Sequence, residues 1–155
     1  MVKFSEPVIS LLLLIVVTSI QGCSATLPPI TREFSIISGD DPPKTQEQGT
    51  TNIVIFNSGN ILLFPVTGRL NVTLNGKGAA QLDIGKFVRF MVPQGRYRVD
   101  LLHHDVFSFA SSHEIELTTA EAFLEVYPTI LSNGAQLVTE LPKDFWKTYT
   151  PIRKE

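Results

Sequence analysis

Hydrophobic and polar residues alternate along several short stretches of the chain from residue 52 onward. Leu70, Val72 and Leu74 are separated by polar residues, and the stretch 96–102 repeats the same period of two. Successive side chains of a β-strand point to opposite faces, so each stretch presents one apolar and one polar face. This pattern is typical of antiparallel strands with one face in a core and the other in solvent.

Turn signals separate these stretches. Asn75-Gly76 follows the stretch 69–74, and both residue types tolerate the positive φ angles of a two-residue type I′ turn. The segment 77–82 is therefore predicted to return antiparallel beside 69–74.

Two further turns are predicted from proline, glycine and asparagine. Pro93 and Gly95 are expected to end the strand 87–92 in a turn. Asn133-Gly134 is expected to form a second hairpin turn that leads into a last strand, 135–141.

About seven strands between residues 52 and 141 predict an all-β fold, a single antiparallel β-sandwich of immunoglobulin-like or transthyretin-like type. The apolar run 122–131 is interpreted as a central strand with a bend at Pro128. A brief helix at 119–123 is the alternative. The remaining tail, 142–155, is rich in aromatic residues and is expected to form a short helical cap.

Several aromatic side chains could serve either as a contact patch or as part of the core. They are Phe107, Phe109, Phe145, Trp146 and Tyr149. Aromatic residues are enriched at protein interfaces, but most of them in a small domain complete the core. The core interpretation is favoured.

The beginning of the chain reads as an export signal. Residues 8–17 are apolar apart from one serine, and the following residues become small and polar. A membrane-spanning helix needs about 20 apolar residues, whereas about 7 to 15 suffice for the core of a secretory signal. Residues 1–22 are therefore predicted to be a signal peptide.

The end of this segment resembles the lipobox of bacterial lipoproteins. Ile20-Gln21-Gly22-Cys23 has the branched aliphatic residue, the tolerant position, the small residue and the cysteine of that motif. The resemblance implies cleavage between Gly22 and Cys23 and alkylation of the Cys23 thiol by diacylglycerol. Ser24 after the cysteine implies sorting to the outer membrane. An ordinary signal peptide with a chance cysteine is the alternative.

Residues 23–51 are predicted to be the lipidated N-terminus followed by a flexible tether. Prolines, glycines and polar residues interrupt this stretch. As a relaxed coil it would reach roughly 30 Å from the bilayer. The segment 31–37 is the exception, because Phe34, Ile36 and Ile37 could dock on the domain as an edge strand or a latch.

Composition excludes several functional classes. The chain has 155 residues, so removal of residues 1–22 leaves 133, enough for one domain. A net charge of −2 provides no basic surface for nucleic acid. A single cysteine cannot make an internal disulfide, an all-cysteine zinc site or an iron–sulfur cluster.

The order of strands and turns resembles small bacterial envelope lipoproteins with an uncharacterised sandwich domain related to PEGA modules. The resemblance covers about residues 52–141. It depends on the motif Leu70-Asn71-Val72-Thr73-Leu74-Asn75-Gly76-Lys77, the hydrophobic stretch 87–92, and the motif Val92-Pro93-Gln94-Gly95-Arg96-Tyr97-Arg98-Val99. Here Gln94 separates the proline and glycine that are adjacent in the family. The motifs are interpreted as a pair of turns that hold three antiparallel strands, and they contain no catalytic group.

Candidate chemistry is sparse. His103, His104, Asp105 and His113 are residue types that bind zinc. However, adjacent strand residues point to opposite faces, so His103 and His104 do not readily share one ion. A surface loop is the favoured interpretation, with no metal site, no catalytic residue and no cofactor expected. Serines near His113 lack the Gly-x-Ser-x-Gly elbow of hydrolases.

The sequence as a whole predicts a non-enzymatic lipoprotein, anchored in the outer membrane and facing the periplasm. Its sandwich is expected to bind another envelope component, most readily a protein that extends an exposed sheet edge. No small-molecule substrate is identified. The alternative is a small periplasmic metal-binding or hydrolytic protein that uses the four residues His103, His104, Asp105 and His113.

Overall fold

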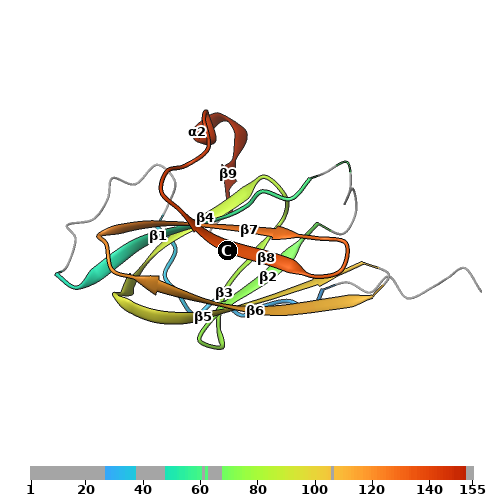
Figure 1. Ribbon diagram of the computed structural model, residues 1–155, viewed down its shortest axis with the longest axis horizontal. Coiled ribbons are helices and arrows are strands. Elements are labelled where there is room, and N and C mark those ends of the chain that lie inside the picture. Colours follow the sequence, from blue (N-terminus) through green and yellow to red (C-terminus); the bar gives the residue numbers. More distant parts are fainter. Residues whose placement is uncertain (1–26, 38–47, 61, 63–67, 106, 153–155) are drawn as a thin grey trace, which may run out of the picture.

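Two β-sheets pack face to face in this computed structural model, which describes residues 27–37, 48–60, 62, 68–105 and 107–152 (Figure 1). The five-stranded sheet has the order β8-β7-β1-β4-β9, and the four-stranded sheet has the order β3-β2-β5-β6. The predicted all-β sandwich is confirmed, with nine strands among the described residues instead of about seven.

Among the described residues, nine strands and one helix follow one another along the chain. They are β1 (Thr50–Asn57), β2 (Leu70–Leu74), β3 (Lys77–Leu82), β4 (Lys86–Pro93), β5 (Gly95–His104), β6 (Ser108–Leu117), β7 (Glu121–Pro128), β8 (Asn133–Val138), α2 (Phe145–Thr148) and β9 (Thr150–Pro151). β9 has only two residues, too few to show a period in the sequence.

The main core fills the space between the sheets. Leu70, Val72 and Leu74 of β2 are fully buried, as their alternation predicts. Ile55 of β1 and Phe90 of β4 belong to the same buried cluster from the opposite sheet. Burial of each large apolar side chain contributes about 1.5–3 kcal/mol, so this cluster is the main source of stability.

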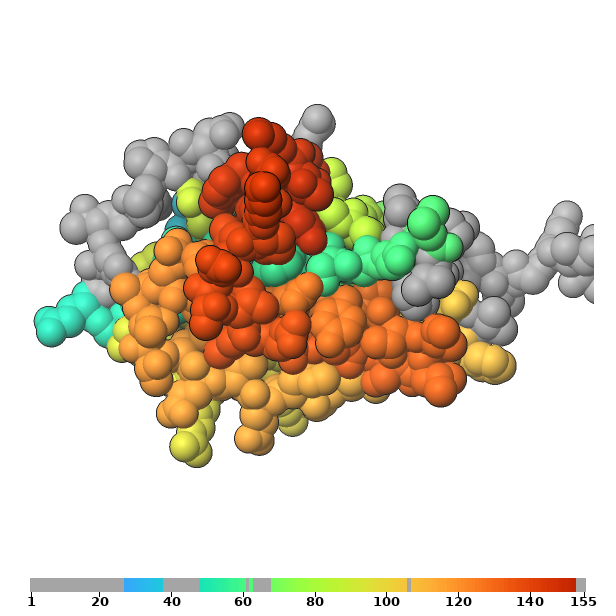
Figure 2. All heavy atoms as spheres, turned by 45° about the horizontal axis from the view of Figure 1, so that its top comes forward, coloured from blue at the N-terminus to red at the C-terminus, as the bar shows by residue number. Residues whose placement is uncertain are grey.

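β1 is buried on both faces. It pairs with β4 in antiparallel and with β7 in parallel orientation. Its second face, with Phe56, packs against Phe145 of α2. A continuous apolar run is typical of a strand that is covered on both sides. Figure 2 shows the C-terminal residues (red) standing out from this face of the sandwich.

The β2–β3 hairpin turns at Asn75 and Gly76. Their φ angles are 51° and 78°, the left-handed values that a type I′ turn requires. The Asn75 side-chain oxygen also accepts a hydrogen bond of 2.8 Å from the backbone amide of Arg98 on β5. The turn is thereby attached to the neighbouring strand.

The connection at Pro93 and Gly95 differs from the expectation of three adjacent antiparallel strands. Pro93 ends β4 and Gly95 begins β5, but these strands belong to different sheets. β4 pairs with β1, whereas β5 pairs with β2 and β6. Gly95 has a φ of 150°, a conformation that favours glycine, and the chain crosses here from one sheet to the other.

The expected turn at Asn133-Gly134 is wrong. These residues begin β8 and pair with Pro128 and Tyr127 at the end of β7. The turn is made by residues 129–132 instead. Pro128 has no amide hydrogen to continue the strand, so the apolar run 122–131 is divided there. The helical alternative for 119–123 is also wrong, because Glu121–Phe123 belongs to β7.

Residues 27–37, called the N-terminal strap from here on, connect the edge strand β3 of one sheet with β4 of the other. The Glu33 amide donates to the carbonyl oxygen of Gly78 on β3, and the Ile37 amide donates to Arg89 on β4, both at 2.8 Å. The Phe34 ring stacks on Phe90 at 4.8 Å. The expected docking of 31–37 is therefore present, and it begins earlier, at Pro28.

Candidate functional site

The strap and β9 cover one side of the sandwich. The strap contacts β3, the edge of the four-stranded sheet, and Ile36 forms a β-bridge with Phe90 of β4. β9 pairs with β4 at Lys86 and Phe87. Apart from the two-residue β9 itself, the described strands that have a single sheet neighbour and no such cover are β6 and β8.

β6 and β8 lie next to each other on the opposite side of the sandwich. Neither contains lysine or proline, two residue types that natural proteins use to block pairing at exposed edges. β6 is ten residues long, and the outward residues Ala110 and Ser112 are exposed and small. Leu137 on β8 is 41% exposed. This pair of edges is the candidate surface for binding an extended chain.

Asn133 joins the two sheets at one end of these edges. Its side-chain amide donates to the carbonyl oxygen of Phe109 at 2.9 Å and faces that of Leu101 at 3.4 Å. Its side-chain oxygen therefore faces Nδ1 of His103, which carries the hydrogen of this bond. The His103 ring stacks on Phe109 with ring centroids 5.0 Å apart.

His103 is fully buried, which overturns the expectation of a surface loop. It lies on β5 and points into the sandwich, whereas the next residue, His104, points outward and is partly exposed. Their opposite directions follow from the alternation of side chains along a strand, as predicted.

His113 and Ser111 make a second contact between the sheets. Both lie on β6, and His113 Nε2 is 3.1 Å from the backbone oxygen of Asn133 and 3.1 Å from Ser111 Oγ. Since a carbonyl oxygen only accepts, Nε2 donates to it and cannot at the same time take a proton from Ser111. This is the reverse of what a serine nucleophile needs from its base.

His104 and Asp105 lie at the tip of the β5–β6 hairpin. His104 Nδ1 is 2.5 Å from Ser108 Oγ, and the Asp105 amide donates to the carbonyl oxygen of Phe107. The structure thus separates the four suspected ligands. His103 is buried, His113 lies on the edge strand β6, His104 ends β5 and Asp105 lies in the turn that follows. Within the described ranges, no three His, Cys, Asp or Glu side chains gather as a metal site.

The outer face of the four-stranded sheet is polar and charged. Asp100 on β5 accepts hydrogen bonds from Ser112 (2.6 Å), Arg98 (3.1 Å) and Thr73 (3.3 Å). Burial on its own raises the pKa of the Asp100 carboxyl, but these hydrogen bonds and the charge of Arg98 lower it below its ordinary value. This face is a solvated surface with satisfied charges.

One end of the sandwich, called the loop end here, exposes large hydrophobic side chains. The described residues of its loops are 58–60, 62, 83–85, 105, 107 and 129–132. Asn133 brings the β7–β8 turn beside the β5–β6 hairpin through its bond to Phe109. Phe107 (69%), Ile130 (72%), Leu131 (80%) and Leu62 (86%) are largely exposed there.

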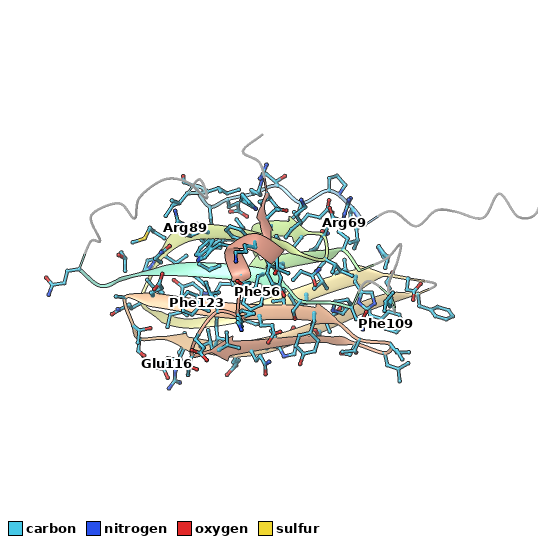
Figure 3. All side chains as sticks on the ribbon, turned by 90° about the horizontal axis from the view of Figure 1, so that it is seen from above. Phe56, Arg69, Arg89, Phe109, Glu116 and Phe123 are labelled. Carbon is cyan, nitrogen blue, oxygen red and sulfur yellow. The ribbon has the colours of Figure 1, made fainter. Side chains whose placement is uncertain are left out.

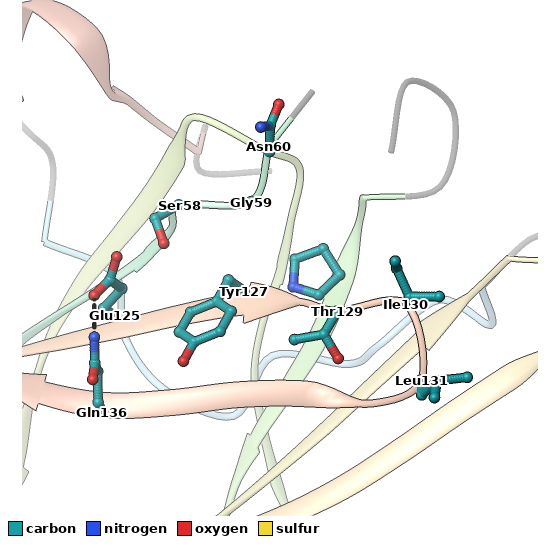
Figure 4. A pocket seen from close by; sticks show the side chains of 10 residues that line it. Ser58, Gly59, Asn60, Glu125, Tyr127, Thr129, Ile130, Leu131 and Gln136 are labelled. Carbon is teal, nitrogen blue, oxygen red and sulfur yellow. Dashed lines mark hydrogen bonds between the residues drawn. The ribbon is translucent and has the colours of Figure 1, made fainter. Parts of the chain in front are cut away.

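An open hollow of about 710 Å³ borders the loop end (Figure 4). Tyr127 lies at its centre with Ile130 and Leu131 at one side, and Glu125 and Gln136, joined by a 2.7 Å hydrogen bond, lie at the other. The Tyr127 ring lies directly over Gly134, where a Cβ would be only 2.3 Å from it. Gly134 thus lies in β8 against the Tyr127 ring and not in a turn.

The structure divides the aromatic residues that could have formed one patch. Phe145 is buried, and Tyr149 and Phe109 are partly buried against other rings. Trp146 remains 59% exposed on α2, and Phe107 is exposed at the loop end. The favoured core interpretation fits the first three residues and not the last two.

Ile20, Gln21, Gly22 and Cys23 lie outside the described residues, as does residue 24. None of the described helices has the length and apolar character needed to cross a bilayer. No protein-family model, curated protein or solved structure matches the chain. The expected relationship to PEGA-type lipoproteins therefore stays a prediction.

Proposed function

We propose that the protein is a non-enzymatic lipoprotein of the cell envelope whose sandwich binds another envelope protein. In this proposal Cys23 becomes the first residue of the mature chain and carries a diacylglycerol thioether, and its freed amine takes a further acyl chain. Two or three acyl chains hold a protein on a bilayer far more firmly than one. The domain is then held at the outer membrane and faces the periplasm.

The observation that carries the binding proposal is the uneven cover of the sheet edges. The chain closes the β3 and β4 side with its own strap and β9. β6 and β8 are left side by side without lysine or proline. An extended segment of a partner can add to such an edge through main-chain hydrogen bonds.

The anchor is tested by expressing the full-length protein and a Cys23→Ala variant in a Gram-negative host. Membranes are fractionated and the mass of the N-terminal peptide is measured. A diacyl or triacyl mass on Cys23 in the outer-membrane fraction, lost in the variant, is expected. An unmodified protein cleaved elsewhere would contradict the anchor.

The edge is tested by photo-crosslinking in living cells. A benzophenone amino acid replaces Glu114 on the edge strand β6, and the matched control replaces Arg98, its cross-strand neighbour on the inner strand β5, whose side chain is 61% exposed. One discrete crosslinked protein from Glu114 and none from Arg98 is expected. Equal crosslinking from both positions, or none from either, would contradict binding at the edge.

The alternative of a metal-binding or hydrolytic protein has no observation in its favour among the described residues. His103 and His113 bond to Asn133, and His104 bonds to Ser108. Stoichiometric zinc in the purified protein, lost in a His104→Ala variant, would support this alternative and count against the proposal.

A further inference from the structure

We infer that the loop end of the sandwich rests in the polar–apolar interface of the membrane that carries the anchor, with Phe107, Ile130 and Leu131 in contact with lipid. This inference rests on the proposed lipidation of Cys23. It adds an orientation and a second, direct membrane contact to the proposed function.

The N-terminal strap begins at the loop end of the sandwich. The carbonyl oxygen of Pro28 accepts hydrogen bonds from Asn71 (2.9 Å) and Gln81 (3.3 Å). Asn71 lies at the start of β2 and pairs with Leu102, two residues from the end of β5. The strap therefore begins at the loop end and runs away from it towards Gly78.

Docking of the strap leaves only a short tether between the lipidated residue and the domain. Leu27 follows Cys23 by four residues, and four residues at full extension span no more than about 14 Å. A tether of 28 residues would have allowed the domain to float free of the bilayer. With the strap docked, the loop end is held within one short segment of the lipidated residue.

The two ends of the sandwich differ in the side chains that they expose. Six large hydrophobic side chains are exposed among the described residues, and four of them, Leu62, Phe107, Ile130 and Leu131, are at the loop end. The turns at the other end expose Asn75, Gln94 and Thr119. Figure 3 shows Phe109 and Arg69 at the loop end and Arg89 and Glu116 towards the opposite end.

Polar groups at the loop end set the depth. Asp105 is exposed beside Phe107, and Arg69 forms an ion pair with Asp83 near the same end. Charged groups are costly in hydrocarbon and are stable among headgroups. The apolar tips therefore enter only the boundary between headgroups and acyl chains, as amphipathic surfaces do.

This orientation has a consequence for partner binding. The strands run lengthwise through the molecule (Figure 1), so they stand end-on to the bilayer when the loop end rests on the membrane. The β6 and β8 edges then run from the membrane surface outward, and their far ends stay accessible to a partner in the periplasm.

Depth-dependent quenching of tryptophan fluorescence tests the inference. The chain has one tryptophan, so Trp146→Phe gives a background in which Ile130→Trp or Phe107→Trp is the only reporter. Gln94→Trp in the same background is the matched control, since it is an exposed turn residue at the opposite end. Each lipidated protein is purified from membranes and reconstituted in vesicles of phosphatidylcholine brominated in its acyl chains, with unbrominated vesicles as reference.

The expected result is loss of more than half of the fluorescence at positions 130 and 107, with a blue-shifted spectrum, and little change at position 94. Equal, weak quenching at all three positions in protein with a confirmed acyl mass on Cys23 would overturn this inference and leave the anchor standing. Absence of the acyl mass would overturn the anchor, and the inference with it. Circular dichroism of each variant verifies that the fold is kept.

Discussion

Gly78 on β3 lies directly beneath the backbone carbonyl of Thr31 in the strap. A Cβ atom on Gly78 would be 2.0 Å from that oxygen and 3.0 Å from the Ile30 side chain. The contact with Thr31 cannot be relieved by rotation of a side chain, because its oxygen belongs to the backbone. The absence of a side chain at position 78 is therefore a condition for docking the strap.

Gly78→Ala is expected to displace the strap and to lower the free energy of unfolding by about 1–3 kcal/mol, the usual cost of overpacking. Urea unfolding gives the energy, and hydrogen exchange at Glu33 and Ile37 reports the strap directly. Lys77→Ala, an exposed neighbour, is the control. Unchanged exchange at Glu33 in the glycine variant would contradict the tight contact.

Asn133→Ala is expected to destabilise the protein by about 2–3 kcal/mol, because the His103 ring nitrogen and the Phe109 carbonyl oxygen lose their hydrogen-bond partner. The effect is measured by denaturant unfolding at neutral pH. Asn60→Ala, at an exposed asparagine of the β1–β2 connection, should change stability little. Similar losses of stability in both variants would contradict a stabilising role for the hydrogen bonds that Asn133 makes between the sheets.

Asp100 should make the fold sensitive to acid. Its pKa is lower in the folded protein than its ordinary value of 3.8, so the unfolded chain takes up the proton first as pH falls. The stabilisation is complete above pH 3.8 and is lost as pH falls through the folded-state pKa. Asp100→Asn is expected to flatten the loss of stability on the acid side in pH-dependent unfolding, and Ser112→Ala to reduce it in part.

Phe145→Ala is expected to cost about 3–5 kcal/mol, the usual range for a buried phenylalanine. Its ring contacts Phe56, Phe87 and Tyr149 on the outer face of the five-stranded sheet. Trp146→Ala is the control, because that ring is 59% exposed and should cost less than half as much. Thermal unfolding of both variants measures the difference, and equal losses would contradict the packing described for α2.

Local sequence patterns predicted β2, the β2–β3 hairpin and the all-β fold class. The alternation in Leu70, Val72 and Leu74 identifies β2 and its buried face, since side-chain direction in a strand depends only on residue order. Asn75-Gly76 identifies the hairpin turn, because the requirement for positive φ is a property of those two residues. The anchor at Cys23 is likewise a prediction from adjacent residues.

Assignments that depended on which strands become neighbours required the tertiary structure. The sequence places Pro93 and Gly95 at a turn, but it does not show that β4 and β5 separate into different sheets. Asn133 is a frequent turn residue, yet here its amide is buried among groups of β5 and β6 that are more than twenty residues away.

The same distinction applies to the strap and the loop end. Pro28 and Pro29 fit the irregular backbone at the start of the strap, but the docking of the strap depends on Gly78, Asn71 and Phe90, residues distant in sequence. Ile130 and Leu131 extend an apolar run that, in sequence, is continuous with β7. Only the pairing of β7 with β8 leaves them exposed in a turn, because burial is set by the packing of both sheets and not by hydrophobicity alone.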